Sequence, residues 1–174
     1  MDGFGFIHET LDIELLILFI LNRLPGAVDK DTLSELTLCD GGINYFNFSE
    51  ALANLVETGH VLCENGMYSS TEKGHRNGSA TESSIPYSVR MKAERNIIPV
   101  ARMLRRSDMI KTGSQPAPNG GYTVHLSLSD GTGYILSMDI LAGSERQASM
   151  MESRFQKHAE DISAQIAAIL TDES

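Results

Sequence analysis

The sequence contains no tryptophan, few aromatic residues of any kind and two cysteines among its 174 residues. Two cysteines, Cys39 and Cys63, are too few for a disulfide framework. We interpret both as reduced, buried residues that behave as small hydrophobic groups. This usage indicates a reducing compartment.

Long hydrophobic runs are also missing. The longest apolar run of the first helix, Leu15 to Leu21, is far shorter than the roughly 20 residues that cross a membrane. The N-terminal sequence MDGFGFIHE has no basic segment of the kind that opens a secretory signal. We therefore interpret the run as a buried helix, and we predict a soluble cytoplasmic protein without membrane association.

Positive charge is scarce and unevenly distributed. The net charge of −9 argues against a general binder of polyanions. Residues 1–89 carry 4 basic and 13 acidic side chains, whereas 7 of the 14 basic residues lie within residues 90–111. One segment of 22 residues therefore holds half of the basic side chains in the chain.

No catalytic or metal-binding motif is present in the sequence. The histidines are scattered, at positions His8, His60, His75, His125 and His158. His158 and Asp161 share a helical face, but two ligands do not make a zinc site. The segment from Asp130 to Gly133 lacks the lysine of a phosphate-binding loop and is typical of a hairpin turn. We predict no enzymatic activity, no metal and no cofactor.

The first half of the chain predicts a winged helix-turn-helix domain over residues 1–82. Helices are predicted over Leu11 to Leu24, from about Asp31 or Thr32 with Thr32 to Glu35 as a capping box, and over Asn47 to Thr58. A short strand is predicted at Ala27-Val28. Asn65-Gly66 is a strong signal for a two-residue hairpin turn between two further strands.

The second half, residues 83–174, predicts a linker helix followed by a β-hairpin and a long helix. The polar sequence GSATESS marks the boundary, and a basic helix runs from Tyr87 to about Met109, with a kink or break expected at Pro99. Residues 112–121 are predicted as a loop, and residues 122–140 alternate as a hairpin. The fold class is therefore α+β.

The last helix carries an apolar stripe that includes Phe155 and Ile169. A lone hairpin is only marginally stable, so this stripe is expected to cover the hairpin, a second subunit or both. The unit is interpreted as a dimerisation or sensor unit. Met138, Met150, Met151 and Phe155 would suit an adaptable pocket for a small-molecule effector, while simple core and dimer packing is the alternative.

Two segments carry a family resemblance. GFIHETLDIELLILFILNRLP (Gly5 to Pro25) and SELTLCDGGINYFNFSEALANLVETGHV (Ser34 to Val61) resemble an uncharacterised bacterial winged-helix family, a domain of unknown function found in Gram-positive anaerobes. More loosely, Leu55 to Gly74 is similar to the end of the recognition helix and the wing of MarR-like and PadR-like repressors. The looser resemblance implies a dimeric transcriptional regulator.

The predicted DNA contacts follow from the winged-helix interpretation. Short polar side chains at or near the third helix and at the wing tip could contact bases or phosphates, namely Asn44, Tyr45, Asn47, Ser49, Asn54 and Asn65. The basic side chains expected to contact phosphates are Lys73, Arg76, Arg95, Arg102 and Arg106. Each polar residue could equally be a helix cap, and each basic residue part of a salt-bridged surface.

The functional hypothesis is a homodimeric regulator that binds double-stranded DNA. The rival hypothesis is a winged-helix module that binds a protein without binding DNA, because fold does not fix function. The two differ in the predicted place of the basic surface. A basic surface contiguous with the third helix and the wing would favour DNA binding. Basic side chains engaged in internal ion pairs would favour docking of a protein.

Overall fold

The computed structural model describes residue 7 and residues 9–171. The chain is a mixed α/β protein with two small antiparallel sheets. Its described residues divide into two compact units, one ending at Leu104 and the other beginning at Arg105. This division lies inside a helix, downstream of the boundary expected near residue 82.

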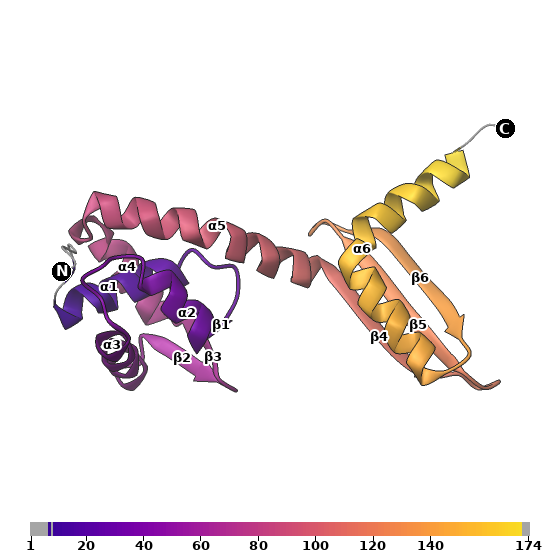
Figure 1. The fold of residues 1–174 in the computed structure, drawn as a ribbon, viewed down its shortest axis with the longest axis horizontal. Coiled ribbons are helices and arrows are strands. Elements are labelled where there is room, and N and C mark those ends of the chain that lie inside the picture. The colour runs from indigo at the N-terminus through magenta and orange to yellow at the C-terminus, as the bar shows by residue number, and fades with distance from the viewer. Residues whose placement is uncertain (1–6, 8, 172–174) are drawn as a thin grey trace. The chain divides into compact units, whose positions relative to one another are not determined.

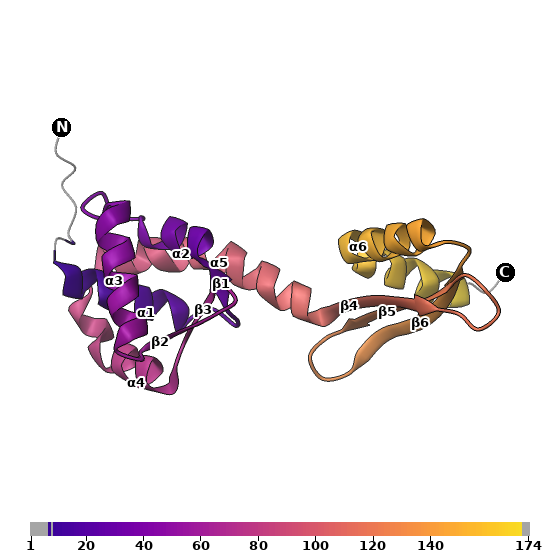
Figure 2. The same ribbon diagram turned by 90° about the horizontal axis from the view of Figure 1, so that it is seen from below.

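The first unit is built around α1 (Thr10–Leu21), which is buried on almost every side. After α1 come β1 (Val28–Asp29), α2 (Lys30–Thr37), α3 (Tyr45–Glu57), the strands β2 (Val61–Glu64) and β3 (Met67–Ser70), and α4 (Glu72–Thr81). Strand β3 lies between β1 and β2. The core consists of apolar side chains from α1, α2 and α3 together with the first part of α5 (Tyr87–Met109). In Figures 1 and 2, α1 lies between α3 and α5.

Local signals explain where the helices begin. The Asp29 carboxylate accepts a hydrogen bond of 2.7 Å from the Thr32 amide, so α2 begins before the predicted capping box. The Thr71 hydroxyl caps α4 in the same way, by accepting from the Gly74 amide at 3.1 Å. The predicted start near Asp31 or Thr32 lies one or two residues after the observed first residue, Lys30, because Asp29 and not Thr32 is the cap.

The predicted hairpin turn at Asn65-Gly66 is confirmed. Both residues have positive φ angles, 52° at Asn65 and 78° at Gly66, as a two-residue turn requires. The strands that it joins pair Val61 with Ser70 and Glu64 with Met67. The turn therefore sets a register in which Cys63 and Tyr68 lie side by side.

The second unit is a three-stranded sheet with α6 (Glu145–Thr171) on one face, as Figures 1 and 2 show. The strands are β4 (Ile110–Pro116), β5 (Tyr122–Ser129) and β6 (Tyr134–Ala142), with β5 in the middle. The core between sheet and helix contains Val124, Leu126, Phe155 and Ala159.

The sequence pattern predicted a two-stranded hairpin here and a loop over residues 112–121. That prediction missed β4, which pairs with β5 from Ile110 to Pro116. Its sequence IKTGSQP has a single large apolar residue, so no alternation marks it as a strand. A proline is tolerated because β4 is an edge strand.

The two long helices each contain one notable position. Helix α5 continues through Pro99, so of the predicted kink or break the break does not occur. Helix α6 has a non-helical residue at His158, with φ −128° and ψ 22°. The Arg106 guanidinium binds at this point, with Nη2 3.2 Å from the Lys157 carbonyl oxygen.

Candidate functional site

The N-terminal end of α3 presents two exposed aromatic side chains. Tyr45 is half exposed and its ring contacts Phe48, with centroids 5.9 Å apart, while the Lys30 ammonium lies 5.3 Å from the Tyr45 centroid. Phe46 is 77% exposed. Phe46 was not among the residues predicted from the sequence, although helical spacing that turns Phe48 inward must turn Phe46 outward.

The predicted polar contacts on α3 are partly engaged within the protein. The Asn44 side chain is the N-cap of α3 and accepts a hydrogen bond of 2.9 Å from the Asn47 amide. The Asn54 amide donates to the Glu14 carboxylate at 3.3 Å, which turns it toward α1. The Ser49 hydroxyl is enclosed and has no hydrogen-bond partner among the residues that the structure describes.

A shallow groove runs between α3 and the β2–β3 hairpin, and we call it the α3 groove. Its volume is about 340 Å³. The wall from α3 is mostly apolar and the wall from the hairpin contributes a thiol and a phenol; the lining residues are Lys30, Ser49, Leu52, Ala53, Val56, Glu57, Cys63 and Tyr68. Burial, followed by a hydrogen bond with Cys63, raises the pKa of Tyr68, so its hydroxyl remains protonated at neutral pH.

The two cysteines differ from the prediction that both are buried. Cys39 is half-buried and Cys63 is exposed at the α3 groove. Burial, aided by the neighbouring Asp40 carboxylate, raises the pKa of the Cys39 thiol. Val61 and Cys63 lie on the same face of β2, and Val61 is buried in the core. Cys63 is exposed because it lies nearer the turn, beyond the edge of that core.

The surface around the α3 groove is acidic. The sequences of α3, β2, β3 and their turn contain no lysine or arginine. Glu50 and Glu57 are exposed on α3, and Glu64 is exposed beside the hairpin turn. Lys30 is therefore outnumbered by carboxylates, and the surface as a whole would repel a phosphate backbone.

The DNA contacts predicted at the β2–β3 turn and in the helix after it lie at separate places. Asn65 is exposed at the tip of the turn. The Lys73 ammonium donates to the Thr58 carbonyl oxygen at 2.8 Å, at the C-terminal end of α3. Arg76 is exposed on α4. Lys73 and Asn65 thus lie at the margins of the α3 surface, and Lys73 is already bound to the backbone.

The arginines of α5 are not brought together with α3. Arg95 and Arg102 are exposed and form no ion pair with any residue that the structure describes. They lie on α5, and α1 separates that helix from α3 (Figures 1 and 2). Arg106 is engaged in its own unit, where its guanidinium binds both carboxylate oxygens of Glu160 at 2.8 Å.

Other basic side chains of the first unit form ion pairs within the protein. Arg23 binds Glu82 at 2.7 Å and Glu94 at 3.4 Å, and its guanidinium lies 3.6 Å from the Phe19 ring centroid. Arg90 lies 3.7 Å from the same Glu82 carboxylate. These pairs join the segment that follows α1 to α5 and to Glu82, which precedes α5, within the first unit. They remove two of its cations from any external ligand.

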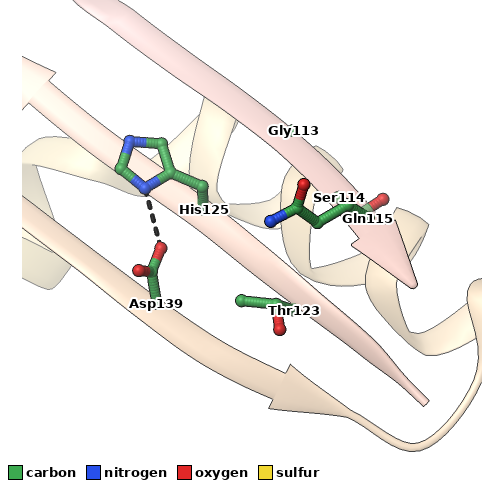
Figure 3. A pocket seen from close by; sticks show the side chains of 6 residues that line it. All are labelled: Gly113, Ser114, Gln115, Thr123, His125 and Asp139. Atoms are coloured by element: carbon green, nitrogen blue, oxygen red, sulfur yellow. Dashed lines mark hydrogen bonds and ion pairs between the residues drawn. The ribbon is translucent and has the colours of Figure 1, made fainter. Parts of the chain in front are cut away.

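A second hollow lies on the face of the C-terminal sheet that α6 leaves open. Its volume is about 370 Å³, and Gly113, Ser114, Gln115, Thr123, His125 and Asp139 line it (Figure 3). His125 Nδ1 lies 2.8 Å from Asp139 Oδ1. Gly113 is the partner of His125 in the neighbouring strand, and its missing side chain opens the space beside the imidazole.

This hollow is on the opposite side of the sheet from the pocket hypothesised for an effector. Of the residues proposed for that pocket, Phe155 is fully buried in the core, and Met138 and Met151 pack against it. Met150 is half exposed. Phe155, Met138 and Met151 therefore belong to the packed core between the sheet and α6.

Within the described residues, no group of three or more His, Cys, Asp and Glu side chains could hold a metal ion. His158 Nδ1 and Asp161 Oδ2, considered earlier as two ligands, are 3.7 Å apart. In the same part of the chain, no helix is both long enough and apolar enough to cross a membrane. His8 lies outside the described residues.

Comparison with known proteins finds a family without an assigned activity. A family model described as a domain of unknown function (DUF4364) matches residues 13–170. No curated protein and no solved structure matches the chain.

Proposed function

We propose that this chain, which belongs to the DUF4364 family, is a dimeric winged-helix protein whose α3 groove docks a protein partner. The element order α1–β1–α2–α3–β2–β3, with β1 beside β3, supports the winged-helix interpretation. In this interpretation α3 is the helix that a DNA-binding relative would place in the major groove, and the β2–β3 hairpin is the wing.

The chemistry of the α3 surface carries the proposal. Phe46 is exposed on α3 and lies about one helical turn before Ser49, the first residue of this helix to line the groove. Leu52 and Val56 line the groove from the same helix. Exposed aromatic side chains next to an apolar groove are characteristic of protein interfaces. Glu50 and Glu57 border this surface, so the partner would present apolar side chains flanked by lysine or arginine.

The test places a photo-reactive amino acid at Ala53, which is exposed and lines the groove, in the full-length protein in its own cells. The matched control carries it at Leu141, an exposed position on β6. A partner cross-linked from position 53 is then purified. We expect it to bind the wild type and to bind an Ala53→Arg variant at least tenfold more weakly in calorimetry.

Two further variants complete this test. Glu57→Lys should weaken the complex through like charge, whereas Ala164→Arg, an exposed change on α6, should not alter it. Equal affinity of the purified partner for wild type and Ala53→Arg would exclude docking in the groove. Circular dichroism establishes that each variant is folded.

A second candidate function, regulation of transcription through double-stranded DNA, is favoured by the exposed amide of Asn65 at the wing tip. Tyr45 and Asn47 lie in the first turn of α3, the part of a recognition helix that reaches base edges. Arg76 is exposed after the wing. With so few cations, binding to DNA would be weak and strongly dependent on salt.

Fluorescence anisotropy decides this second candidate. The wild type is titrated against its own upstream DNA and against a scrambled duplex over a salt series. A preference for its own DNA that Asn47→Ala and Asn65→Ala both reduce would establish a DNA-binding regulator and would displace the docking proposal. Weak binding of equal affinity to both duplexes, without dependence on salt, would exclude the DNA-binding function.

A further inference from the structure

Helix α5 carries an exposed stripe that neither core covers. Tyr87, Met91, Arg95, Ile98 and Arg102 follow one another at intervals of four, four, three and four residues, so they lie on one helical face. Ile98 is 57% exposed and Tyr87 is 70% exposed. We call these five residues the α5 stripe. It combines apolar side chains with arginines that form no ion pair in the described chain.

Helix α6 carries a second exposed stripe beyond its irregular residue at His158. Ile162, Ile166, Ile169 and Leu170 lie along this end of the helix, and we call them the α6 stripe. Ile162 still packs against the core of its unit. Ile169 is 75% exposed and Leu170 is 79% exposed, and nothing in the described residues packs over them.

The two stripes have opposite charge. Residues 159–174 contain Asp161, Asp172 and Glu173 and no lysine or arginine, and their fourth acidic residue, Glu160, is already paired with Arg106 at 2.8 Å. Around the α5 stripe the side chains are basic, and Glu94, the acidic residue of that segment, is paired with Arg23 at 3.4 Å. Two copies of the α5 stripe would oppose arginine to arginine, which disfavours a dimer through α5 alone.

The α6 stripe is shorter than the α5 stripe and fits within its length. From Tyr87 to Arg102 the α5 stripe extends about 24 Å, and from Ile162 to Leu170 the α6 stripe extends about 14 Å, at 1.5 Å per residue. An antiparallel arrangement would place the C-terminal end of α6, with its partial negative charge, toward Arg95. Asp161 would then lie toward Arg102.

We propose that the α6 stripe of one protomer packs on the α5 stripe of its partner, and the reverse, to form an exchanged dimer. The inference rests on the dimer included in the proposed function and names its interface. It assigns Arg95 and Arg102 to the dimer, where partner carboxylates would neutralise them, and not to DNA. The α3 groove takes no part in this interface.

Cysteine cross-linking tests the arrangement in the full-length protein carrying Cys63→Ser, which removes the exposed native thiol. One preparation carries Ile98→Cys and the other carries Ile166→Cys, and a short bis-maleimide is added to each alone and to their mixture. We expect a cross-linked dimer in the mixture and none in either preparation alone. Asn96→Cys, exposed on α5 but off the stripe, replaces Ile98→Cys in the control mixture and should not cross-link.

Each other outcome overturns the proposal. A dimer from Ile98→Cys alone would mean that α5 pairs with α5, and one from Ile166→Cys alone that α6 pairs with α6. In a third preparation that carries both Ile98→Cys and Ile166→Cys, a cross-link within a single chain would mean that no exchange occurs. A monomer in sedimentation equilibrium, or a dimer that none of these pairs cross-links, would also contradict it.

Charge and apolar substitutions provide an independent measurement. Sedimentation equilibrium should give a dimer dissociation constant at least tenfold higher for Arg95→Glu with Arg102→Glu, and for Leu170→Asp. The controls are Arg154→Glu, an exposed arginine on α6, and Leu141→Asp, an exposed leucine on β6; both should dimerise as the wild type does. Ala53→Arg should also dimerise normally, so failure of partner docking and failure of dimerisation are separately observed.

Discussion

At Gly74 the backbone of α4 passes against the turn that leads into β2. A β-carbon at this position would collide with the His60 carbonyl oxygen and would lie 2.8 Å from the Ser70 hydroxyl. We expect Gly74→Ala to lower the free energy of unfolding by about 1–3 kcal/mol, the usual cost of overpacking. Gly26→Ala is the control, because a β-carbon added there would have nothing within 4 Å. Urea unfolding measures both, and equal midpoints would contradict the predicted collision.

The Arg106–Glu160 pair makes stability depend on pH. The hydrogen bonds from the Arg106 guanidinium lower the pKa of the Glu160 carboxyl below its ordinary value of about 4.3. A lowered folded-state pKa contributes stability that is present above the ordinary value and is lost as the pH falls through the folded-state value. The pair is half exposed, so its contribution is below about 1 kcal/mol.

We therefore expect Glu160→Gln to be less stable than the wild type at pH 7, with a difference that shrinks as the pH falls below about 4. Urea unfolding at several pH values gives this difference directly. The control is Glu152→Gln, a change on the same helix without an ion pair in the described chain. A difference for Glu160→Gln that stays constant from pH 7 to pH 3 would mean that the amide, not the charge, matters.

Some features of single residues could be predicted from the sequence and others could not. The Asn65-Gly66 turn could be predicted because a two-residue hairpin with positive φ angles strongly selects these residue types. The engagement of Arg106 could not, because its partner Glu160 is 54 residues away in the sequence. Long-range partners of charged side chains leave no periodic signal.

Among the elements, α3 begins with a cap that was predicted as a DNA contact. The Asn44 side chain accepts from the Asn47 amide, and aspartate can accept the same hydrogen bond. We expect Asn44→Ala to lower the free energy of unfolding by about 1 kcal/mol and Asn44→Asp to leave it almost unchanged. Thermal unfolding of the two variants checks this. A loss of stability in both variants would show that the amide group has another role.

The helices and strands also differ in how well they could be predicted from their sequences. Helix α1 could be predicted from its continuous apolar run followed by Pro25-Gly26, and strands β5 and β6 from apolar side chains at alternating positions. Strand β4 has no such pattern and owes its existence to pairing with β5 along seven residues. Pro99 predicted a kink or a break in α5, and the break does not occur because Ile97 and Ala101 pack in the core on both sides of the proline.

For the whole molecule, the two cores share no residue. Phe48 is fully buried in one and Phe155 in the other. We expect Phe48→Leu and Phe155→Leu to destabilise different parts of the protein, by about 1–3 kcal/mol each. Hydrogen exchange monitored by mass spectrometry resolves the two units. Uniform loss of protection in both units from either substitution would mean that the molecule unfolds as a single cooperative body.

The separation of the basic side chains of α5 from α3 could not be predicted from the sequence. The count of basic residues in the segment from Arg90 to Lys111 identified where positive charge is concentrated. It could not reveal that α1 separates this helix from α3 (Figures 1 and 2). The position of a charged face depends on which side of its helix enters the core, and that depends on the packing of the entire unit.

The placement of the two cysteines gives the protein an intrinsic reporter of occupancy. Cys63 is exposed in the α3 groove, whereas Cys39 is half-buried and its raised pKa leaves little of the reactive thiolate. A thiol reagent applied to the wild-type protein should therefore modify Cys63 first. Whatever fills the groove should slow that reaction and leave the rate at Cys39 unchanged, so a colorimetric assay could screen for ligands of this surface without any engineered probe.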